Sequence, residues 1–374
     1  YYQDLTLHDM KAIVQVSSKV LKTPTEVMLE QLLRDLILKV EFYDKQAAAP
    51  ENSSTFSMNA FFAVASLKMR CKLWKQRADR SAQKRGQVWS VGSNSHGQGG
   101  SLKRVEEIIA APRIVSYFAA PRAICLKQIA CGSLHAGAVS DQGRVFLWGD
   151  NAWGQCGQEE VEIARVPSHV PQLKDITMIA LGGDFSLAVS ESGSVFSFGR
   201  NHHGQLGRTA DPAGRHFRPM AIGEKMFMHF KIIFVAAGEA HAACTDKAGN
   251  GFTWGWNVFC QLGSGDTKDR DYPVHLVQTA RAAISVACGA EHTIFVTNAG
   301  EFLSCGNDGD GALGTGVARG AGQSAYQFVP RHCFLPGQQL ARKVCCGFYH
   351  TLILSEKGEV YACGLGRNMQ LGMG

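Results

Sequence analysis

Five stretches of this sequence, each 29 residues long, align with one another without a gap. They are Ile129–Gly157, Ile179–Gly207, Val235–Gly263, Val286–Gly314 and Val344–Gly372. Their starts are 50, 56, 51 and 58 residues apart, so the connecting segments vary in length while the unit does not. A repeat of this size is a supersecondary unit that buries its hydrophobic face only by stacking on its neighbours. The chain is therefore expected to form one repetitive architecture.

Glycine and short apolar runs recur at fixed positions in every copy. One glycine column comprises Gly149, Gly199, Gly255, Gly306 and Gly364. In the first copy, the runs His135–Ser140 and Val145–Trp148 flank a glycine turn, which predicts a β-hairpin. A third strand is expected upstream, as at Cys125–Gly132, and a fourth at proline-marked segments such as Arg218–Met220 and Tyr272–Val274. Four strands per unit, repeated around an axis, predict the blade of a β-propeller.

The repeat resembles that of a known family. Its pattern is G-x-x-H, a turn glycine, and then W-G-x-N-x-x-G-Q-L-G, with departures such as Phe185 for the histidine and Ala312 for the glutamine. This pattern is similar to the repeat of the regulator of chromosome condensation family and extends over residues 86–374. The resemblance implies a mainly β fold, a propeller of seven blades.

A sixth copy, Gly86–Gly100, contains only the second half of the repeat. Lys75 stands where the first motif glycine of this copy would belong. The resemblance implies that the missing inner strands of the first blade come from the far end of the chain, which leaves no sheet edge open. We therefore expect six visible repeats of an incomplete seven-bladed ring, a native protein that continues beyond Gly374, and a gap between Val88–Val91 and Val360–Cys363.

Two polar side chains recur with the period of the repeat. The histidines are His135, His241, His292 and His350. One histidine per blade is too far from the next to share a metal, so we expect each to hydrogen-bond a neighbouring loop and fix the geometry of its blade. The glutamines are Gln98, Gln155, Gln205, Gln261 and Gln370, and we expect their amides to satisfy the backbone of the turns. Neither set predicts a metal site, and no cofactor is expected.

The tryptophans of the repeats fall into two groups. Trp89, Trp148 and Trp254 lie in a repeat strand, which predicts core packing between blades. Trp153 and Trp256 lie in the turn that follows this strand. These two are candidates for contacts with a protein partner.

Charge and cysteine usage separate the N-terminal part of the chain from the repeats. Of the 38 basic and 32 acidic residues, residues 1–85 carry 14 and 9, which leaves 24 and 23 for residues 86–374. A nearly neutral repeat region attracts a phosphate backbone only weakly, so nucleic acid is not the expected partner of the propeller. The 12 cysteines include no Cys-x-x-Cys pair, which indicates small buried side chains in a reducing compartment. We expect an intracellular protein, cytoplasmic or cytoskeletal, without a membrane span.

The first 85 residues predict helices. Thr23–Glu26 offers an N-cap, a proline at N1 and a capping-box glutamate, so residues 1–46 are expected to form a helical hairpin. Residues 47–60 are an expected linker, and residues 61–85 a basic amphipathic helix. The candidate partner-binding residues of this helix are Lys68, Arg70, Lys72, Trp74, Lys75 and Arg77. The helix either packs against the propeller with its charges in solvent or binds an acidic protein surface, nucleic acid or a membrane surface.

No catalytic motif accompanies the repeats. The chain contains no P-loop, no H-E-x-x-H and no plausible G-x-S-x-G elbow, so we expect no enzyme. The favoured function is a non-enzymatic scaffold or adaptor subunit of a larger assembly, cytoskeletal or ciliary for example, that binds proteins through propeller loops and N-terminal helices. The alternative implied by the resemblance is a guanine-nucleotide exchange factor for a small Ran-like GTPase. A third class is the substrate-recognition region of a ubiquitin ligase.

Overall fold

The computed structural model describes part of the chain. The described residues are 87–101, 107–119, 124–159, 161–223, 227, 229–279, 282–316 and 325–372. The helical hairpin, linker and basic helix expected in residues 1–85 lie outside them, as do all six candidate residues of that helix. Among the described residues, no helix is long and apolar enough to cross a membrane.

The described residues form 21 strands in six antiparallel sheets. The first sheet contains β1 (Trp89–Ser93) and β2 (Ile108–Ile114). The second contains β3 (Leu126–Cys131), β4 (His135–Ser140), β5 (Val145–Asp150) and β6 (Ile163–His169). The third contains β7 (Ile176–Leu181), β8 (Phe185–Ser190), β9 (Val195–Asn201) and β10 (Asp211–Ile222).

The remaining sheets repeat this order. The fourth contains β11 (Ile232–Ala237), β12 (His241–Asp246), β13 (Gly251–Gly255) and β14 (Arg270–Leu276). The fifth contains β15 (Ala283–Cys288), β16 (His292–Thr297), β17 (Phe302–Asn307) and β18 (Tyr326–Cys333). The sixth contains β19 (Ala341–Cys346), β20 (His350–Ser355) and β21 (Val360–Gly364). Short 3-10 turns lie at Ser116–Phe118, Val277–Thr279 and Pro336–Gln338.

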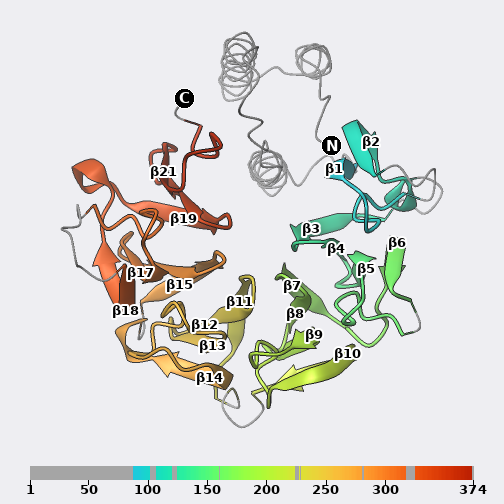
Figure 1. Cartoon of the computed structure of the whole chain (residues 1–374), viewed down its shortest axis with the longest axis horizontal. Coiled ribbons are helices and arrows are strands. Elements are labelled where there is room, and N and C mark those ends of the chain that lie inside the picture. The colour runs from blue at the N-terminus through green and yellow to red at the C-terminus, as the bar shows by residue number, and fades with distance from the viewer. Residues whose placement is uncertain are drawn as a thin grey trace, which may run out of the picture.

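The sheets are the blades of a propeller. Figure 1 shows them around a common centre, with β3, β7, β11, β15 and β19 innermost and the last strand of each blade at the rim. The expected matching strands Val145–Trp148, Val195–Phe198 and Thr253–Trp254 all lie in the third strand of their blades. The prediction of equivalent four-stranded blades is confirmed for four of the five motif windows, whereas the last window has three described strands.

The recurring glycine at the end of the third strand is required by a close backbone approach. In the second blade, Gly149 lies opposite His135, has φ +114, and would place a Cβ 2.5 Å from the backbone oxygen of Leu134. The same contact recurs at Gly199, Gly255, Gly306 and Gly364, where φ lies between +100 and +112 and the distances are 2.3–2.6 Å. Any other side chain would clash with the turn that carries the motif histidine or, in the third blade, Phe185.

Apolar side chains from neighbouring blades interdigitate to form the core. Between the second and third blades, Val145 and Leu147 pack with Ile179 and Leu181, and all four are buried. Burial of each such side chain is worth about 1.5–3 kcal/mol, so the seams between blades carry much of the stability.

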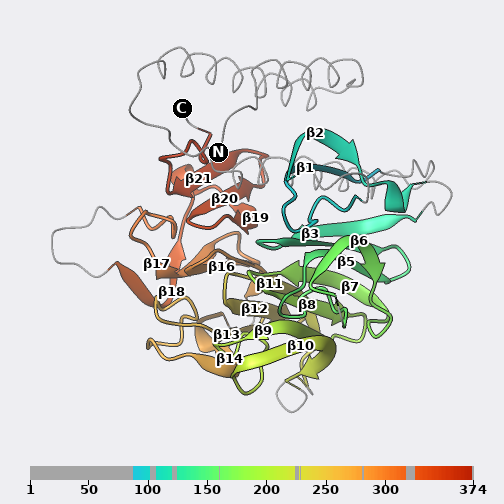
Figure 2. The same ribbon diagram turned by 45° about the vertical axis from the view of Figure 1, so that its right-hand side comes forward.

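The two blades with fewer than four described strands lie at the two ends of the arc that the described blades form. Figure 1 shows β1–β2 and β19–β21 at these ends, and Figure 2 shows the same arc turned by 45°. Trp89 was expected in the core but is 45% exposed, whereas Phe146, at the equivalent position of the second blade, is 3% exposed. The reason is that Phe146 packs against the blade before it, and no described blade precedes β1–β2. The described residues do not test the seven-bladed ring or the inner strands of the first blade, and both stay predictions.

Candidate interaction surface

The motif histidines join neighbouring blades. His135 Nε2 lies 3.0 Å from Ser186 Oγ of the next blade, and that hydroxyl donates to the backbone oxygen of Gln155 at 2.7 Å. Because the single hydroxyl proton goes to the carbonyl, the imidazole must donate to the hydroxyl oxygen. The same arrangement joins His241 to Thr293 and Gln261 (2.9 and 2.7 Å), and His292 to Thr351 and Ala312 (2.9 and 2.7 Å). The expected loop partner is therefore wrong for these three histidines, because each of them bonds a strand of the next blade.

A second arrangement occurs at seams where the preceding blade contributes no histidine. The third blade has Phe185 at the motif-histidine position, and the fourth blade has Ala242 at the position of the hydroxyl residue. Ala242 lies opposite Trp254, whose Nε1 donates to the Gln205 carbonyl at 2.9 Å. The carbonyl that would otherwise take a serine or threonine hydroxyl is thus satisfied by an indole. The second blade has the same solution, with Ala136 opposite Trp148 and Trp148 Nε1 bonded to the Gln98 carbonyl at 2.8 Å. The two seam types are called hydroxyl seams and indole seams below.

Burial keeps the seam histidines neutral. His135, His241 and His292 are each at most 1% exposed. Desolvation lowers the pKa of His135 and of His241 to about 3 and that of His292 to about 4. These rings are uncharged at physiological pH and closed to solvent, so they act as structural hydrogen-bond donors. The recurring glutamines behave as predicted, since Gln98, Gln155, Gln205, Gln261 and Gln370 each accept from a backbone N–H two residues upstream.

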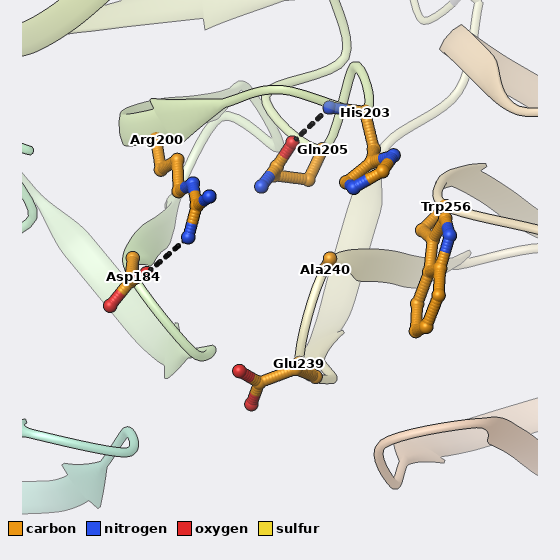
Figure 3. Close-up of a pocket in the computed structure, with 7 residues that line it drawn as sticks. All are labelled: Asp184, Arg200, His203, Gln205, Glu239, Ala240 and Trp256. Atoms are coloured by element: carbon orange, nitrogen blue, oxygen red, sulfur yellow. Dashed lines mark hydrogen bonds and ion pairs between the residues drawn. The ribbon is translucent and has the colours of Figure 1, made fainter. Parts of the chain in front are cut away.

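A hollow of about 180 Å³ lies over the seam between the third and fourth blades. It is lined by Asp184, Arg200, His203, Gln205, Glu239, Ala240 and Trp256 (Figure 3). These residues come from the G-x-x-H turns and from the segments after the recurring glycine, which lie together because His241 pairs with Gly255 and Phe185 with Gly199. We call this feature the Glu239 hollow.

Charged and aromatic groups face each other in the Glu239 hollow. Arg200 donates to Asp184 at 3.0 Å, and Figure 3 places this pair on one side of the hollow and Trp256 on the other. Glu239 accepts from the Ser133 hydroxyl at 3.2 Å. Burial raises the pKa of Glu239, and the Asp184 charge adds to this rise, whereas Ser133 and Arg200 oppose it. Proteins recognise one another through such combinations of aromatic rings, arginine and partly desolvated charge.

Comparison with known proteins identifies the repeat. The family model of the RCC1-like domain matches residues 81–374. The chain belongs to the RCC1-like domain family. Its sequence is 34% identical over 257 residues to the Ultraviolet-B receptor UVR8 of Arabidopsis thaliana, covering 67% of this chain and 56% of the receptor. It is 38% identical over 273 residues to the X-linked retinitis pigmentosa GTPase regulator of Canis lupus familiaris, covering 72% of this chain and 26% of the regulator.

A solved structure shows the same fold. Prp20p from Saccharomyces cerevisiae matches with a TM-score of 0.67 and 25% sequence identity, covering 77% of this chain and 70% of Prp20p. The RCC1-like chain spans about half of the length of the plant receptor and about a quarter of that of the canine regulator.

The two candidate tryptophans of the RCC1-like propeller lie near this hollow, and both are partly buried rather than fully exposed. The Arg200 guanidinium carbon lies 4.9 Å from the Trp153 ring centroid, and His202 meets the same ring edge-on at 5.0 Å. Trp256 packs beside His203 at 5.6 Å. The aromatic contacts continue from Trp256 through Phe259 to Tyr326 of the fifth blade at 5.1 and 5.8 Å. A chain of rings thus runs across neighbouring blades.

Sequence reasoning missed Asp184, Arg200 and Glu239. They stand next to the recurring motif glycines, at positions whose residue type changes from copy to copy, so no periodic signal marks them. The described residues contain no group of three or more histidine, cysteine or acidic side chains placed to hold a metal ion.

Proposed function

We propose that this RCC1-like propeller is a non-enzymatic interaction scaffold whose partners bind over the Glu239 hollow. The observation that carries the proposal is the composition of that hollow. Two blades contribute two carboxylates, a guanidinium and an indole to one surface. Such a surface can contact a partner through aromatic burial and paired charges at once.

The state of the recurring side chains supports a scaffold rather than an enzyme. General acid–base catalysis needs a group with a pKa near the working pH and access to substrate. The seam histidines have pKa values of about 3 to 4 and are buried between blades. The motif that dominates the sequence therefore serves the ring, and binding is assigned to the side chains around it.

The N-terminal segment supplies a second contact in this proposal. Lys68, Arg70, Lys72, Lys75 and Arg77 would bind an acidic surface of another subunit, with Trp74 adding apolar contact. We place this assembly in a reducing compartment, since the cysteines among the described residues form no disulfide.

The test compares variants of the full chain in cells. Trp256→Ala and Glu239→Gln alter the hollow, whereas Tyr272→Ala removes a ring that is 60% exposed and lies in the rim strand β14. Quantitative affinity purification should show one or more partners reduced about tenfold or more by Trp256→Ala and unaffected by Tyr272→Ala. Partners retained equally by all three variants would contradict a binding role of the hollow.

The alternative is a guanine-nucleotide exchange factor for a small GTPase. It is favoured by the likeness to Prp20p, whose structure is described together with its binding to Gsp1p and histones. A nucleotide-release assay with purified protein and a panel of small GTPases separates the two functions. Catalytic acceleration of release would replace the scaffold proposal by the exchange function.

A further inference from the structure

One buried amide in the Glu239 hollow lacks the acceptor that its counterpart has. In the second blade, Gln155 Nε2 donates to Asp150 Oδ2 at 2.6 Å. The third blade has Arg200 at the position of Asp150, and a guanidinium offers no acceptor. Gln205 is 2% exposed and its Oε1 accepts from the His203 N–H at 2.9 Å, but no described residue accepts from its Nε2. Figure 3 shows this nitrogen turned into the hollow, which indicates an acceptor brought by a ligand.

The carboxylate of Glu239 is held in a fixed position over the third blade. Its Oε2 accepts from the Ser133 hydroxyl at 3.2 Å. Its Oε1 lies over Gly183, where an added Cβ would be only 2.8 Å from that oxygen. A glycine at this position therefore leaves the space that the carboxylate occupies.

This carboxylate has no cationic partner among the described residues. Arg200 pairs with Asp184 at 3.0 Å, and none of the ion pairs between described residues includes Glu239. Burial raises the pKa of Glu239, and the charge of Asp184 raises it further. A partly buried carboxylate without a cation is costly, so a cationic ligand would stabilise it.

The acidic character continues beyond the hollow. Glu239, Glu291 and Tyr349 lie in turns that follow the innermost strands β11, β15 and β19. Burial raises the pKa of Tyr349, and the charges of Glu291, Glu239 and Asp310 raise it further. Acidic groups of several blades thus act on one side chain. A ligand segment that leaves the hollow towards these turns meets more negative charge.

The two unsatisfied groups restrict the chemistry of the ligand. An anion would accept from Gln205 Nε2 but would be repelled by Glu239 and Asp184. A bare metal cation would pair with Glu239 but would offer no acceptor to Gln205. A peptide with a basic side chain carries both a cation and neutral main-chain acceptors, and it therefore suits both groups.

We infer that the Glu239 hollow binds one arginine side chain of a basic peptide segment in a partner protein. The inference rests on the proposed function and names the chemistry of its partner. The guanidinium would donate to Glu239 and lie against the Trp256 indole, while a main-chain carbonyl of the segment would accept from Gln205 Nε2. Arginine fits better than lysine, because its planar guanidinium both pairs with carboxylates and stacks on aromatic rings. The Arg200 guanidinium already makes such a contact with Trp153, at 4.9 Å from the ring centroid.

The first experiment selects ligands without knowledge of the partner. The immobilised full chain is presented with a phage-displayed library of random peptides. Retained peptides should be enriched in arginine, and the enrichment should disappear with Glu239→Gln. Glu191→Gln is the matched control, because Glu191 is exposed and lies at the other end of β8 from Asp184, in the turn before β9. Retention of no peptide, retention of peptides without arginine, or an enrichment that survives Glu239→Gln would overturn the inference.

The second experiment leaves the protein unchanged and alters the peptide. One selected arginine peptide is labelled, and its affinity for the full chain is measured by fluorescence polarisation. Replacement of its arginine by citrulline, which is neutral and similar in shape, should weaken binding about tenfold or more, because a charge-assisted hydrogen bond is lost. A citrulline peptide that binds as tightly as the arginine peptide would overturn the inference even if Glu239→Gln fails to fold.

Further variants separate the source of the arginine and the two proposals. Substitution of Lys72, Lys75 and Arg77 by alanine should leave the peptide affinity unchanged at about 0.15 M salt, where distant charges are screened. A tenfold rise would show that the chain's own basic segment competes for the hollow and would overturn the assignment to a partner. If Trp256→Ala removes cellular partners but the selected peptides lack arginine, the proposed function stands and this inference alone fails. Cellular partners that ignore Trp256→Ala would overturn both.

Discussion

Thr293→Ala should be among the most destabilising single substitutions in this propeller. The Thr293 hydroxyl accepts from His241 Nε2 and donates to the Gln261 carbonyl, and all three residues are fully buried. The substitution leaves one donor and one acceptor without partners in a dry seam. Each such group costs about 1–3 kcal/mol, so the loss should be about 2–6 kcal/mol. That is a large part of the stability of a typical domain.

The indole seam predicts how to recover this loss. Adding His241→Phe removes the donor that Thr293→Ala leaves without a partner. The seam between the third and fourth blades already has this pair, with Phe185 facing Ala242. Adding Cys305→Trp supplies an indole at the position where Trp254 reaches the Gln205 carbonyl. The order of stability should therefore be Thr293→Ala lowest, the double variant higher, and the triple variant close to wild type.

Urea denaturation followed by far-ultraviolet circular dichroism measures these differences. The reciprocal change at the natural indole seam, with Phe185→His, Ala242→Thr and Trp254→Cys together, is the control for tolerance of repacking. A triple variant that is no more stable than Thr293→Ala would refute the idea of two interchangeable seam chemistries, provided that the reciprocal variant folds. If Thr293→Ala costs less than about 0.5 kcal/mol, the hydrogen bonds themselves have little weight.

Three further predictions follow from the same geometry. Gly149→Val should lower the free energy of unfolding by about 2 kcal/mol or more, since its Cβ would lie 2.5 Å from a backbone oxygen at φ +114. Gly358→Val, at φ +88 with no atom within 4 Å, should lose only the free energy of the backbone strain, and urea denaturation compares the two. The seam histidines have pKa values of about 3 to 4, below the 6.5 of the unfolded chain, so their contribution to stability is complete above pH 6.5. At pH 5 it should have fallen by about 2 kcal/mol per histidine, because the unfolded chain binds protons that the folded chain does not. Urea denaturation at the two pH values measures this loss, and a stability that does not change with pH would contradict it. Reversal of Lys72, Lys75 and Arg77 to glutamate should weaken assembly, which should also be salt-sensitive in the wild type; co-purification that ignores both changes would leave the segment a packing role.

Much of the fold was predictable because the repeat is periodic. The glycine columns and the alternation of short strands and turns placed the third strands correctly, since a turn that needs positive φ leaves the same mark in each copy. Trp89 was misjudged because burial depends on the blade on the other side of the seam, and a sequence pattern within one copy carries no information about that neighbour. The N-terminal predictions lie outside the described residues.

The partners of the histidines could have been found from the sequence. The residue after the motif position is serine or threonine in the copies that follow a histidine, namely Ser186, Thr293 and Thr351, and it is alanine at Ala242, which follows Phe185. The signal lies between consecutive copies rather than within a column. The Glu239 hollow has no such signal, because Asp184 and Glu239 occupy positions that differ in every copy and only the ring brings them together.

The two seam types restrict how a gene for this protein could gain repeats. A tandem duplication places a blade after its own copy. The residue at its motif-histidine position, which faces the next blade, must then fit the residue that directly follows that position in the same blade, which faces the previous blade. The fifth blade passes this condition, because it contributes Thr293 to the seam before it and His292 to the seam after it. The third blade fails, because it would set Phe185 against the hydroxyl of Ser186. Growth of the array by single-blade duplication is therefore open to some blades and closed to others until a second, compensating substitution occurs.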